Sequence, residues 1–161
     1  PMYRHCRVES AAEMYDASVA AFAEVDAAIM TAAVADYTPA HVEMEKMKRE
    51  KTGDLLLALK PTRDIAASLG ELKRKDERKV LVGFALETND ETWNAKDKLM
   101  RKNLDFIVLN SLKDAGAGFR CDTNKISIID HKGKNDYPLK PKTEVAEDIV
   151  DRLVEVLKNK S

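Results

Sequence analysis

The sequence has few of the residues that mark metal-binding and disulfide-bonded proteins. It contains two cysteines, Cys6 and Cys121, which lie far apart and lack the close spacing of a metal-binding motif. The three histidines, His5, His41 and His131, are scattered, and none belongs to a pattern such as H-E-x-x-H. We therefore expect reduced thiols and no zinc site held by the protein.

Long apolar runs and an excess of one charge are also missing. No run approaches the roughly 18 residues that span a bilayer, and the opening "PMYRHCRV" lacks the basic and then apolar pattern of a signal peptide. The net charge is -1, whereas a nucleic-acid-binding surface normally needs a clear excess of Lys and Arg. We therefore expect a cytoplasmic protein that binds neither membranes nor nucleic acids.

Glycine-rich phosphate-binding motifs are absent from the sequence. The six glycines form neither the P-loop pattern G-x-x-x-x-G-K-S/T nor the dinucleotide pattern G-x-G-x-x-G. The "GAG" at 116–118 is too short to count as either. A conventional P-loop or dinucleotide-binding fingerprint is therefore excluded.

The chain does have the length and composition of one globular domain. It contains 161 residues, of which 44% are apolar and 34% charged, which suits a single core. Apolar runs alternate with helical patterns, and this alternation predicts an α/β fold: a three-layer α/β/α domain with a mainly parallel, Rossmann-like sheet and an antiparallel edge. The expected helices cover 9–24, 62–74, 89–103 and 142–160, and the expected strands cover 26–35, 55–60, 79–86, 105–111 and 125–130.

Several of these segments carry a more detailed expectation. The runs 26–35 and 79–86 have the apolar character of buried strands, and 125–130 alternates like an edge strand. Thr62 is the expected N-cap of the second helix. Residues 38–54, which are mostly polar, and the Gly-rich residues 114–124 are expected to be loops.

The stretch "TAAVADYTP" (31–39) places an aspartate after a run of small apolar residues. Because open α/β sheets bind ligands at the carboxyl ends of their strands, Asp36 is a candidate site residue. Ala32 is small enough to let a ligand lie against the backbone. The alternative is an aspartate that bonds to the backbone of the turn before Pro39.

Two groups of cations are candidates for binding phosphates. The segment "EKMKREK" (45–51) contains Lys46 and can act as a flap that closes over a negatively charged substrate. Lys98 and Lys102 are four residues apart and therefore share one face of a helix, where they can face a triphosphate. The alternatives are a solvated charge run and cations that favour the end of a helix.

Phe84 follows Gly83 near the end of an apolar run. An aromatic ring at the end of a strand is either part of the core or a platform for a nucleobase. Both interpretations remain open on the sequence alone.

Five segments, "AAVADYTP", "EKMKRE", "GFALET", "RKNLDFIVLN" and "GFRCDTN", together resemble the bacterial phosphopantothenate-cysteine ligase of coenzyme A biosynthesis in order and spacing. The resemblance extends over nearly all 161 residues. In that family the ligase is often the C-terminal half of a bifunctional protein whose N-terminal half is an FMN-dependent phosphopantothenoylcysteine decarboxylase. The resemblance implies a ligase domain over residues 1–161, with FMN confined to a decarboxylase domain that is not present in this chain.

The resemblance also implies a reaction and a set of site residues. In the family, CTP activates the carboxylate of 4'-phosphopantothenate as an acyl-cytidylate and releases pyrophosphate, and the amine of L-cysteine then attacks. Because two polyanions meet, the reaction requires Mg²⁺ and lysine ammonium groups. The resemblance implies a homodimer, with residues 34–60 as the expected interface, and makes Lys46 the catalytic flap residue. The implied nucleotide-binding residues are Ala32, Asp36, Lys46, Arg63, Asp64, Ile65, Ala66, Phe84, Lys98 and Lys102.

The sequence departs from the family in two places. A Pro-Asp-Ile-Leu-like element follows the strand at 55–60 in the family, whereas this chain has "TRDIAA", with Arg63 in place of the proline. The N-terminal Gly-rich segment of the family, which includes an asparagine needed for turnover of the intermediate, has no counterpart here. We therefore expect a ligase domain that lacks its N-terminal Gly-rich β-α unit and whose activity alone is reduced or absent.

Three alternatives remain open at this point. The nucleotide can be ATP, as in the eukaryotic relatives. The chain can be a nucleotide-binding regulatory or assembly module without turnover. It can also be an α/β domain of an unrelated transferase, in which case Lys46→Ala would leave activity unchanged.

Overall fold

A five-stranded mixed sheet lies at the centre of the structure, a computed structural model that describes residues 3–42, 45, 56–87, 91–111 and 122–160. In chain order the elements are α1 (Ala11–Glu24), β1 (Ala27–Met30), β2 (Tyr37–Pro39), β3 (Leu59–Pro61), α2 (Ile65–Lys73), β4 (Val80–Glu87), α3 (Glu91–Arg101), β5 (Phe106–Ser111), β6 (Thr123–Asn124), β7 (Ile126–Asp130), β8 (Lys134–Asp136), β9 (Lys140–Pro141) and α4 (Lys142–Lys160). Within the described ranges, no helix combines the length and apolar character needed to cross a membrane.

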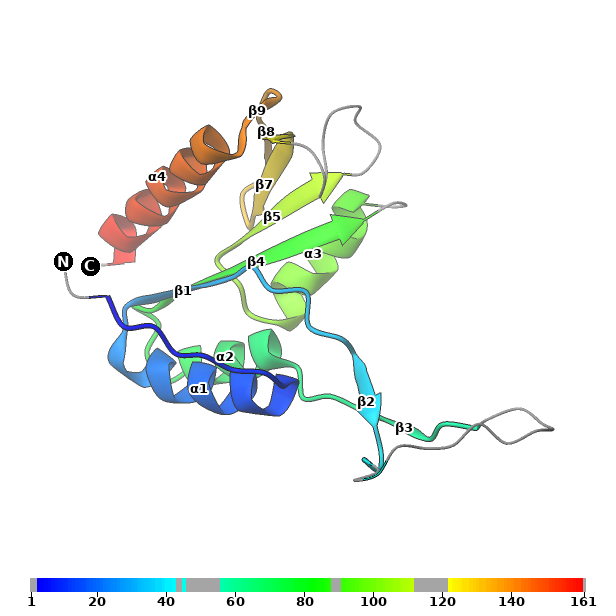
Figure 1. Cartoon of the computed structure of the whole chain (residues 1–161). Helices are drawn as coiled ribbons and strands as arrows, with labels where there is room; N and C mark the ends of the chain where they lie inside the picture. Colours follow the sequence, from blue (N-terminus) through cyan, green and yellow to red (C-terminus); the bar gives the residue numbers. More distant parts are fainter. Residues whose placement is uncertain (1–2, 43–44, 46–55, 88–90, 112–121, 161) are drawn as a thin grey trace.

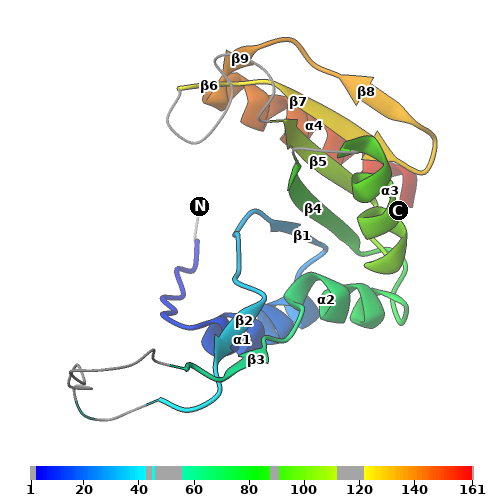
Figure 2. The ribbon, with the colours of Figure 1, turned by 90° about the vertical axis from the view of Figure 1, so that its right-hand side faces the viewer.

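The strands of the main sheet run in the order β1-β4-β5-β7-β8. β1, β4 and β5 are parallel, with Met30 opposite Gly83 and Val82 opposite Phe106, and β7 and β8 continue the sheet in antiparallel fashion. Helices α1, α2 and α3 lie on one side of the sheet and α4 on the other (Figure 1, Figure 2). This arrangement confirms the predicted three-layer α/β/α fold with parallel strands at its centre and an antiparallel edge.

Each face of the sheet has its own apolar core. One core contains Phe22, Leu69 and Leu99 from α1, α2 and α3, and the other contains Val145 and Ile149 from α4. Neighbouring residues of β4 serve both cores, because successive side chains of a strand point to opposite faces. Val80, Leu81 and Val82 are each 0% exposed, which confirms that the run 79–86 is a strand buried on both faces.

The four predicted helices are present, and local chemistry explains where two of them begin. Ser10 forms a capping box with Glu13 at the start of α1. The prediction that Thr62 caps the second helix is wrong, because α2 begins later and Asp64 is its N-cap, accepting a hydrogen bond of 3.0 Å from the Ala67 N–H. A carboxylate is the stronger candidate at this position, since it both accepts the bond and complements the positive end of the helix dipole.

The prediction of a buried strand over 26–35 is wrong in its length and its burial. β1 covers Ala27–Met30 only, none of its residues is buried, and it forms an edge of the described sheet. The alanines that follow Met30 have low strand propensity and little apolar surface to bury. Asp36 therefore does not end a strand of the main sheet but immediately precedes β2.

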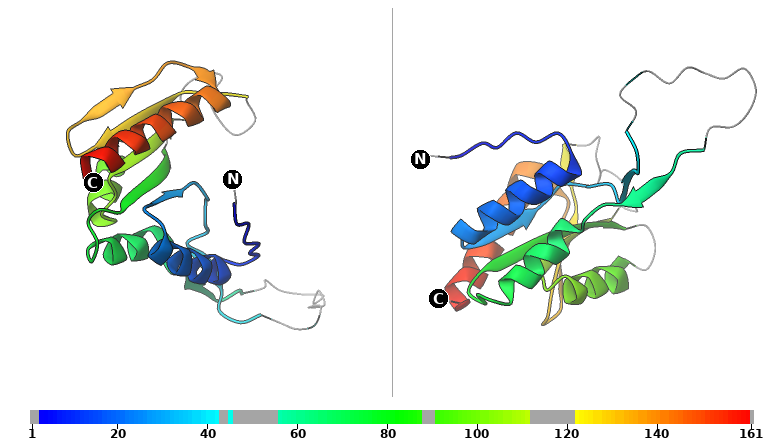
Figure 3. Two further views of the ribbon diagram at one scale, coloured as in Figure 1. Left: turned by 90° about the vertical axis from the view of Figure 1, so that its left-hand side faces the viewer. Right: turned by 90° about the horizontal axis from the view of Figure 1, so that it is seen from below.

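The strand predicted over 55–60 forms in part, but it lies outside the main sheet. β3 pairs in antiparallel fashion with β2, a short strand that overlaps the start of the predicted loop 38–54, and Thr38 lies opposite Lys60. The two strands form a ribbon that projects from the body of the molecule (Figure 3). Most of the predicted loops 38–54 and 114–124 lie outside the described residues.

The prediction that 125–130 is an edge strand is also wrong. β7 lies between β5 and β8, and Ile126, Ile128 and Ile129 are buried. β8, which takes the edge position, consists of exposed Lys134, Asn135 and Asp136, so it lacks the apolar signal by which a strand is found in a sequence.

Candidate functional site

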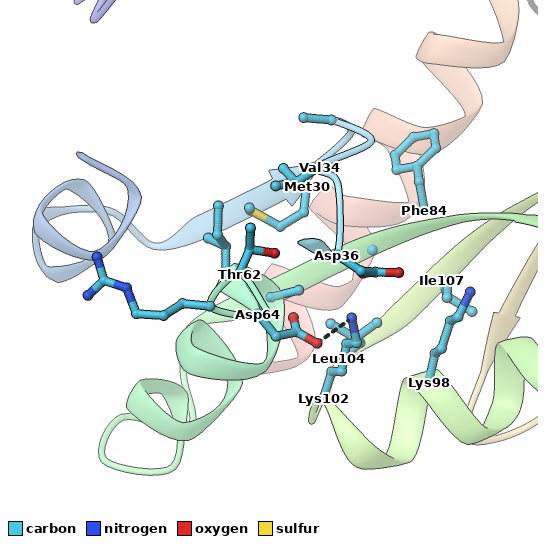
Figure 4. Close-up of a pocket in the computed structure, with 15 residues that line it drawn as sticks. Met30, Val34, Asp36, Thr62, Asp64, Phe84, Lys98, Lys102, Leu104 and Ile107 are labelled. Carbon is cyan, nitrogen blue, oxygen red and sulfur yellow. Dashed lines mark ion pairs between the residues drawn. The ribbon is translucent and has the colours of Figure 1, made fainter. Parts of the chain in front are cut away.

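A pocket of about 160 Å³ lies beside the end of β1, between the middle of β4, the start of α2 and the end of α3 (Figure 4). Its floor is apolar and includes Met30, Leu104 and Ile107, whereas its rim carries charged side chains. The volume enclosed by the described residues is smaller than that of a typical ligand site, roughly 300–1,000 Å³. The pocket therefore suits part of an elongated ligand.

The pocket is lined by every predicted nucleotide-binding residue that the structure describes. These residues are Ala32, Asp36, Arg63, Asp64, Ile65, Ala66, Phe84, Lys98 and Lys102. Lys46, the predicted catalytic residue, lies outside the described residues. The structure thus brings together residues from separate segments of the chain, and their part in nucleotide binding stays a prediction.

Asp36 is held in place through its backbone. The Thr62 N–H donates to the Asp36 carbonyl at 2.8 Å, and the Thr62 hydroxyl donates to the Ala35 carbonyl at 2.6 Å. Among the described residues, no group donates a hydrogen bond to the Asp36 carboxylate. Because no backbone N–H of a described residue donates to this carboxylate, the interpretation of Asp36 as a pocket residue is favoured over that of an aspartate that stabilises a turn.

Asp64 and Lys102 form an ion pair across the pocket, with 2.8 Å between Lys102 Nζ and Asp64 Oδ2. Burial opposes the ionised form of Asp64, but hydrogen bonds from Lys102 and the Ala67 N–H, together with the charges of Lys102 and Arg101, outweigh it and lower the pKa of this carboxyl. Asp64 therefore stays ionised at neutral pH, and it holds the Lys102 ammonium within the pocket.

The end of α3 supplies the cations of the pocket. Lys98 and Lys102 are linked by a backbone hydrogen bond of 3.0 Å from the Lys102 N–H to the Lys98 carbonyl, and both side chains rise toward the segment that carries Asp36 (Figure 4). Arg101, by contrast, pairs with Asp97 at 2.6 Å on the exposed side of the helix. The pair at positions 98 and 102 therefore shares one face of the site, as the spacing predicted.

Arg63 directs its charge away from the centre of the pocket. Its guanidinium lies 3.6 Å from the centre of the Tyr15 ring and pairs with Asp16 at 3.0 Å. Both partners belong to α1, so Arg63 fastens the segment before α2 to the first helix. Because its guanidinium is paired with α1, the group that Arg63 can offer at the pocket is its backbone.

Phe84 is 37% exposed, although Val80, Leu81 and Val82 of the same strand are fully buried. β1 ends opposite Gly83, so the next residue of β4 has no strand beside it on that side. The interpretation of Phe84 as an ordinary core residue therefore loses support. Phe84 is among the residues that line the pocket, and its ring projects from the side of β4 opposite to Lys98 and Lys102 (Figure 4).

Sequence reasoning missed the part that Gly83 plays in shaping this pocket. A Cβ at Gly83 would come within 2.6 Å of Leu104 Cδ1, so the glycine lets Leu104 form the pocket floor. Nothing local in the sequence marks Gly83 as part of a site.

The chain is similar to curated proteins of two kinds. It is 56% identical over 148 residues to a protein of an unknown prokaryotic organism named cysteine/cysteine sulfinic acid decarboxylase, over 91% of this chain and 40% of that protein. It is 43% identical over 152 residues to the coenzyme A biosynthesis bifunctional protein CoaBC of Bacillus subtilis (strain 168), over 94% of this chain and 36% of that protein. The chain thus spans about two fifths of the length of these curated relatives.

A solved structure and a family model both match the C-terminal domain of such proteins. The crystal structure of the C-terminal domain of a CoaBC protein has a TM-score of 0.75 and 34% identity, and the similarity covers 96% of this chain and 66% of that one. The model described as DNA/pantothenate metabolism flavoprotein C-terminal domain matches residues 1–157. These matches confirm the resemblance at the level of the domain. The chain belongs to the DNA/pantothenate metabolism flavoprotein C-terminal domain family.

Proposed function

We propose that the chain is the ligase domain that joins 4'-phosphopantothenate and L-cysteine to give 4'-phosphopantothenoylcysteine in coenzyme A biosynthesis, with CTP converted to CMP and pyrophosphate. The observation that carries the proposal is the single pocket in which Asp36, Phe84, Lys98 and Lys102 meet. These residues come from separate segments, and their types match the parts of a nucleotide. Similarity to the CoaBC proteins supports the same conclusion.

The reaction has two steps, and the pocket offers groups suited to the first. A carboxylate oxygen of 4'-phosphopantothenate attacks the α-phosphorus of CTP and displaces pyrophosphate. The cysteine amine then attacks the acyl carbon, releases CMP and loses a proton. Lys98 and Lys102 balance the charge of the triphosphate, and the Phe84 ring offers a surface on which a base can stack. We assign the flap role near the α-phosphate to Lys46.

The proposed Mg²⁺ is one that arrives with the nucleotide. Among the described residues there is no group of three or more His, Cys, Asp or Glu side chains that could hold a metal ion. Mg²⁺ in nucleotide sites is commonly bound by one or two carboxylates together with phosphate oxygens. The pocket fits this mode, because Asp36 is available while Asp64 is paired with Lys102. The ion would offset the charge of the triphosphate, with Asp36 as its protein ligand.

We also propose that the protein acts in the cytoplasm as a homodimer. The projecting ribbon and the residues just before β3 expose large apolar side chains, including Tyr37 at 62%, Leu57 at 55% and Leu59 at 54%. Such a group of exposed apolar residues is typical of an interaction surface. It falls within residues 34–60, the expected interface. Sedimentation analysis would return a monomer mass if this part of the proposal is wrong.

The ligase reaction is tested by mixing the intact protein with 4'-phosphopantothenate and either CTP or ATP, and measuring pyrophosphate before and after L-cysteine is added. We expect pyrophosphate release with CTP. Lys46→Gln should abolish this release with little change in the free energy of unfolding, because a flap lysine contributes little to the core. The matched control is Lys158→Gln, at an exposed position of α4. Unchanged release in Lys46→Gln would remove Lys46 from the mechanism, and nucleotide binding without release would support the non-catalytic module.

The relative that is 56% identical gives a second candidate function. Its name describes the decarboxylation of cysteine or cysteine sulfinic acid, and the similarity covers 40% of its length. Cysteine is also a substrate of the proposed ligase, so the two reactions share one reactant. Incubation with L-cysteine or L-cysteine sulfinate separates them: carbon dioxide release without a nucleotide would support the decarboxylase.

A further inference from the structure

Helix α2 and the end of α3 approach each other unusually closely at Gly70. A Cβ at Gly70 would come within 2.0 Å of the Lys102 carbonyl oxygen and 2.8 Å of its carbonyl carbon. Both are backbone atoms, which cannot rotate aside as a flexible side chain can. Glycine is otherwise unfavourable inside a helix, so its presence here is explained by the contact with α3.

The turn that ends α3 is fixed to the same glycine. Asn103 has a φ of 51°, the single positive value among the described non-glycine residues. The Leu104 N–H donates to the Leu99 carbonyl at 3.0 Å and the Asn103 N–H to the Met100 carbonyl at 3.2 Å, which is the Schellman pattern of a helix end. The Asn103 side-chain amide then donates to the Gly70 carbonyl at 2.9 Å.

Lys102 lies between these two contacts and the pocket. Its carbonyl lies against Gly70, and its ammonium is paired with Asp64. Asp64 is the N-cap of the helix that contains Gly70. One helix therefore contacts Lys102 twice, at its backbone through Gly70 and at its charged end through Asp64, and Asn103 holds the adjoining turn.

We propose that Gly70 and Asn103 are positioning residues that direct the Lys102 ammonium into the pocket. The close contact at Gly70 fixes the backbone from which the lysine extends, and the amide of Asn103 keeps the turn in the one conformation that allows this contact. The identity of the ligand, the triphosphate of CTP, rests on the proposed function. The arrangement of Lys102 against Asp64 does not depend on it.

Two substitutions disturb the contact in different ways. Asn103→Gly keeps the positive φ at little cost and removes the amide that bonds to Gly70. Gly70→Ala adds a methyl group where the Lys102 backbone lies and forces the two helices apart. Gly133→Ala is the matched control, because a Cβ at Gly133 has no neighbour within 4 Å.

The first readout requires no ligand. The pKa of the Asp64 carboxyl, followed by carbon-13 NMR, should rise toward its ordinary value in Asn103→Gly and Gly70→Ala, because the Lys102 ammonium no longer lies beside it. Gly133→Ala should leave it unchanged. If both variants are folded and keep the wild-type pKa of Asp64, the proposal is overturned, because a purely structural contact would lower stability without moving this pKa.

The second readout is the KM for CTP, which should rise about three- to tenfold in Asn103→Gly, the range expected for one hydrogen bond, while kcat changes much less. A wild type that ignores CTP, combined with a raised Asp64 pKa in the variants, would overturn the proposed function and leave the positioning role standing. If the wild type turns CTP over and both variants match it in KM and in the pKa of Asp64, the positioning role is overturned and the proposed function stands.

Discussion

Thr62 joins two segments of the pocket through both of its hydrogen-bonding groups. Its N–H and its hydroxyl reach the carbonyls of Asp36 and Ala35, which lie on the segment between β1 and β2. Residues 31–36 belong to no helix or strand, so these bonds help to determine where Asp36 lies. The Thr62 hydroxyl therefore stabilises the structure although it does not cap a helix.

Thr62→Val removes the hydroxyl bond and preserves the shape of the side chain. We expect a loss of about 1 kcal/mol in the free energy of unfolding, the usual contribution of one hydrogen bond, measured by urea denaturation. Thr38→Val is the control, since the Thr38 hydroxyl has no hydrogen bond to another described group. Equal unfolding midpoints for wild type and Thr62→Val would show that the bond at 2.6 Å contributes nothing.

Residue type revealed much of the candidate site, whereas long-range contacts were hidden. Asp36, Phe84 and the two lysines at 98 and 102 stand out because a charged or aromatic residue follows an apolar run or repeats at helical spacing. Thr62 and Ala35 are 27 residues apart in the chain, and no local pattern predicts their bond. The contact between Gly70 and Lys102 is equally invisible, since it depends on how two helices pack.

At the scale of elements, Asp130 connects the β7–β8 turn to α4. Its carboxylate accepts hydrogen bonds from the N–H groups of Lys132 and Gly133 at 2.8 and 2.9 Å, and it pairs with the Arg152 guanidinium. Burial opposes the charged form, but the hydrogen bonds from Gly133, Lys132 and Arg152 outweigh it and lower the pKa of this carboxyl. The ionised group therefore stabilises the fold.

The lowered pKa of Asp130 determines the pH range in which its contribution to the free energy of unfolding is lost. Because the pKa of Asp130 is lower in the folded than in the unfolded protein, its stabilisation is complete above the unfolded value, about 3.9, and declines as the pH falls through the folded value. Asp130→Asn should lower the free energy of unfolding by about 1–3 kcal/mol at pH 7, and the difference from wild type should shrink below about pH 4.

Chemical denaturation at a series of pH values measures this difference. Asp151→Asn, at an exposed position of α4, controls for the removal of one negative charge from the same region. A gap between wild type and Asp130→Asn that stays constant down to pH 2 would contradict the assignment of the effect to ionised Asp130.

The sequence predicted the elements with strong periodicity and missed those without it. The four helices and the buried strands β4 and β5 were found because their apolar residues bury against a core. β8 could not be found, since its exposed residues bury nothing. β1 was predicted too long because small apolar residues resemble a buried strand even where, as in residues 31–35, they form no strand.

At the scale of the whole molecule, Asp105 holds elements from both sides of the sheet. It pairs with Lys73 of α2 at 2.7 Å and with Lys160 of α4 at 2.6 Å, and its carboxylate also accepts the Leu81 N–H of β4 at 2.7 Å. Burial lowers the pKa of the Lys73 ammonium, although the bond and the charge of Asp105 oppose this effect. Lys73 therefore depends on Asp105 for its charge.

Asp105→Asn should be among the most destabilising single substitutions in the chain. It leaves the Lys73 ammonium, whose side chain is 7% exposed, without its counter-charge, and breaking such a buried pair typically costs about 3–5 kcal/mol. Calorimetry should show a lower Tm, and Asp122→Asn, at an exposed position, should not. A Tm close to that of wild type would mean that solvent reaches Lys73 easily.

The exposed ring at position 84 extends from a strand whose first three residues are fully buried. The backbone of Phe84 lies beside Val108 of β5, and the preceding residues of β4 are enclosed on both faces. A ligand that contacts this ring meets a group whose main chain is already immobilised. The backbone at Phe84 therefore loses little conformational entropy when a ligand binds, because folding has already fixed it.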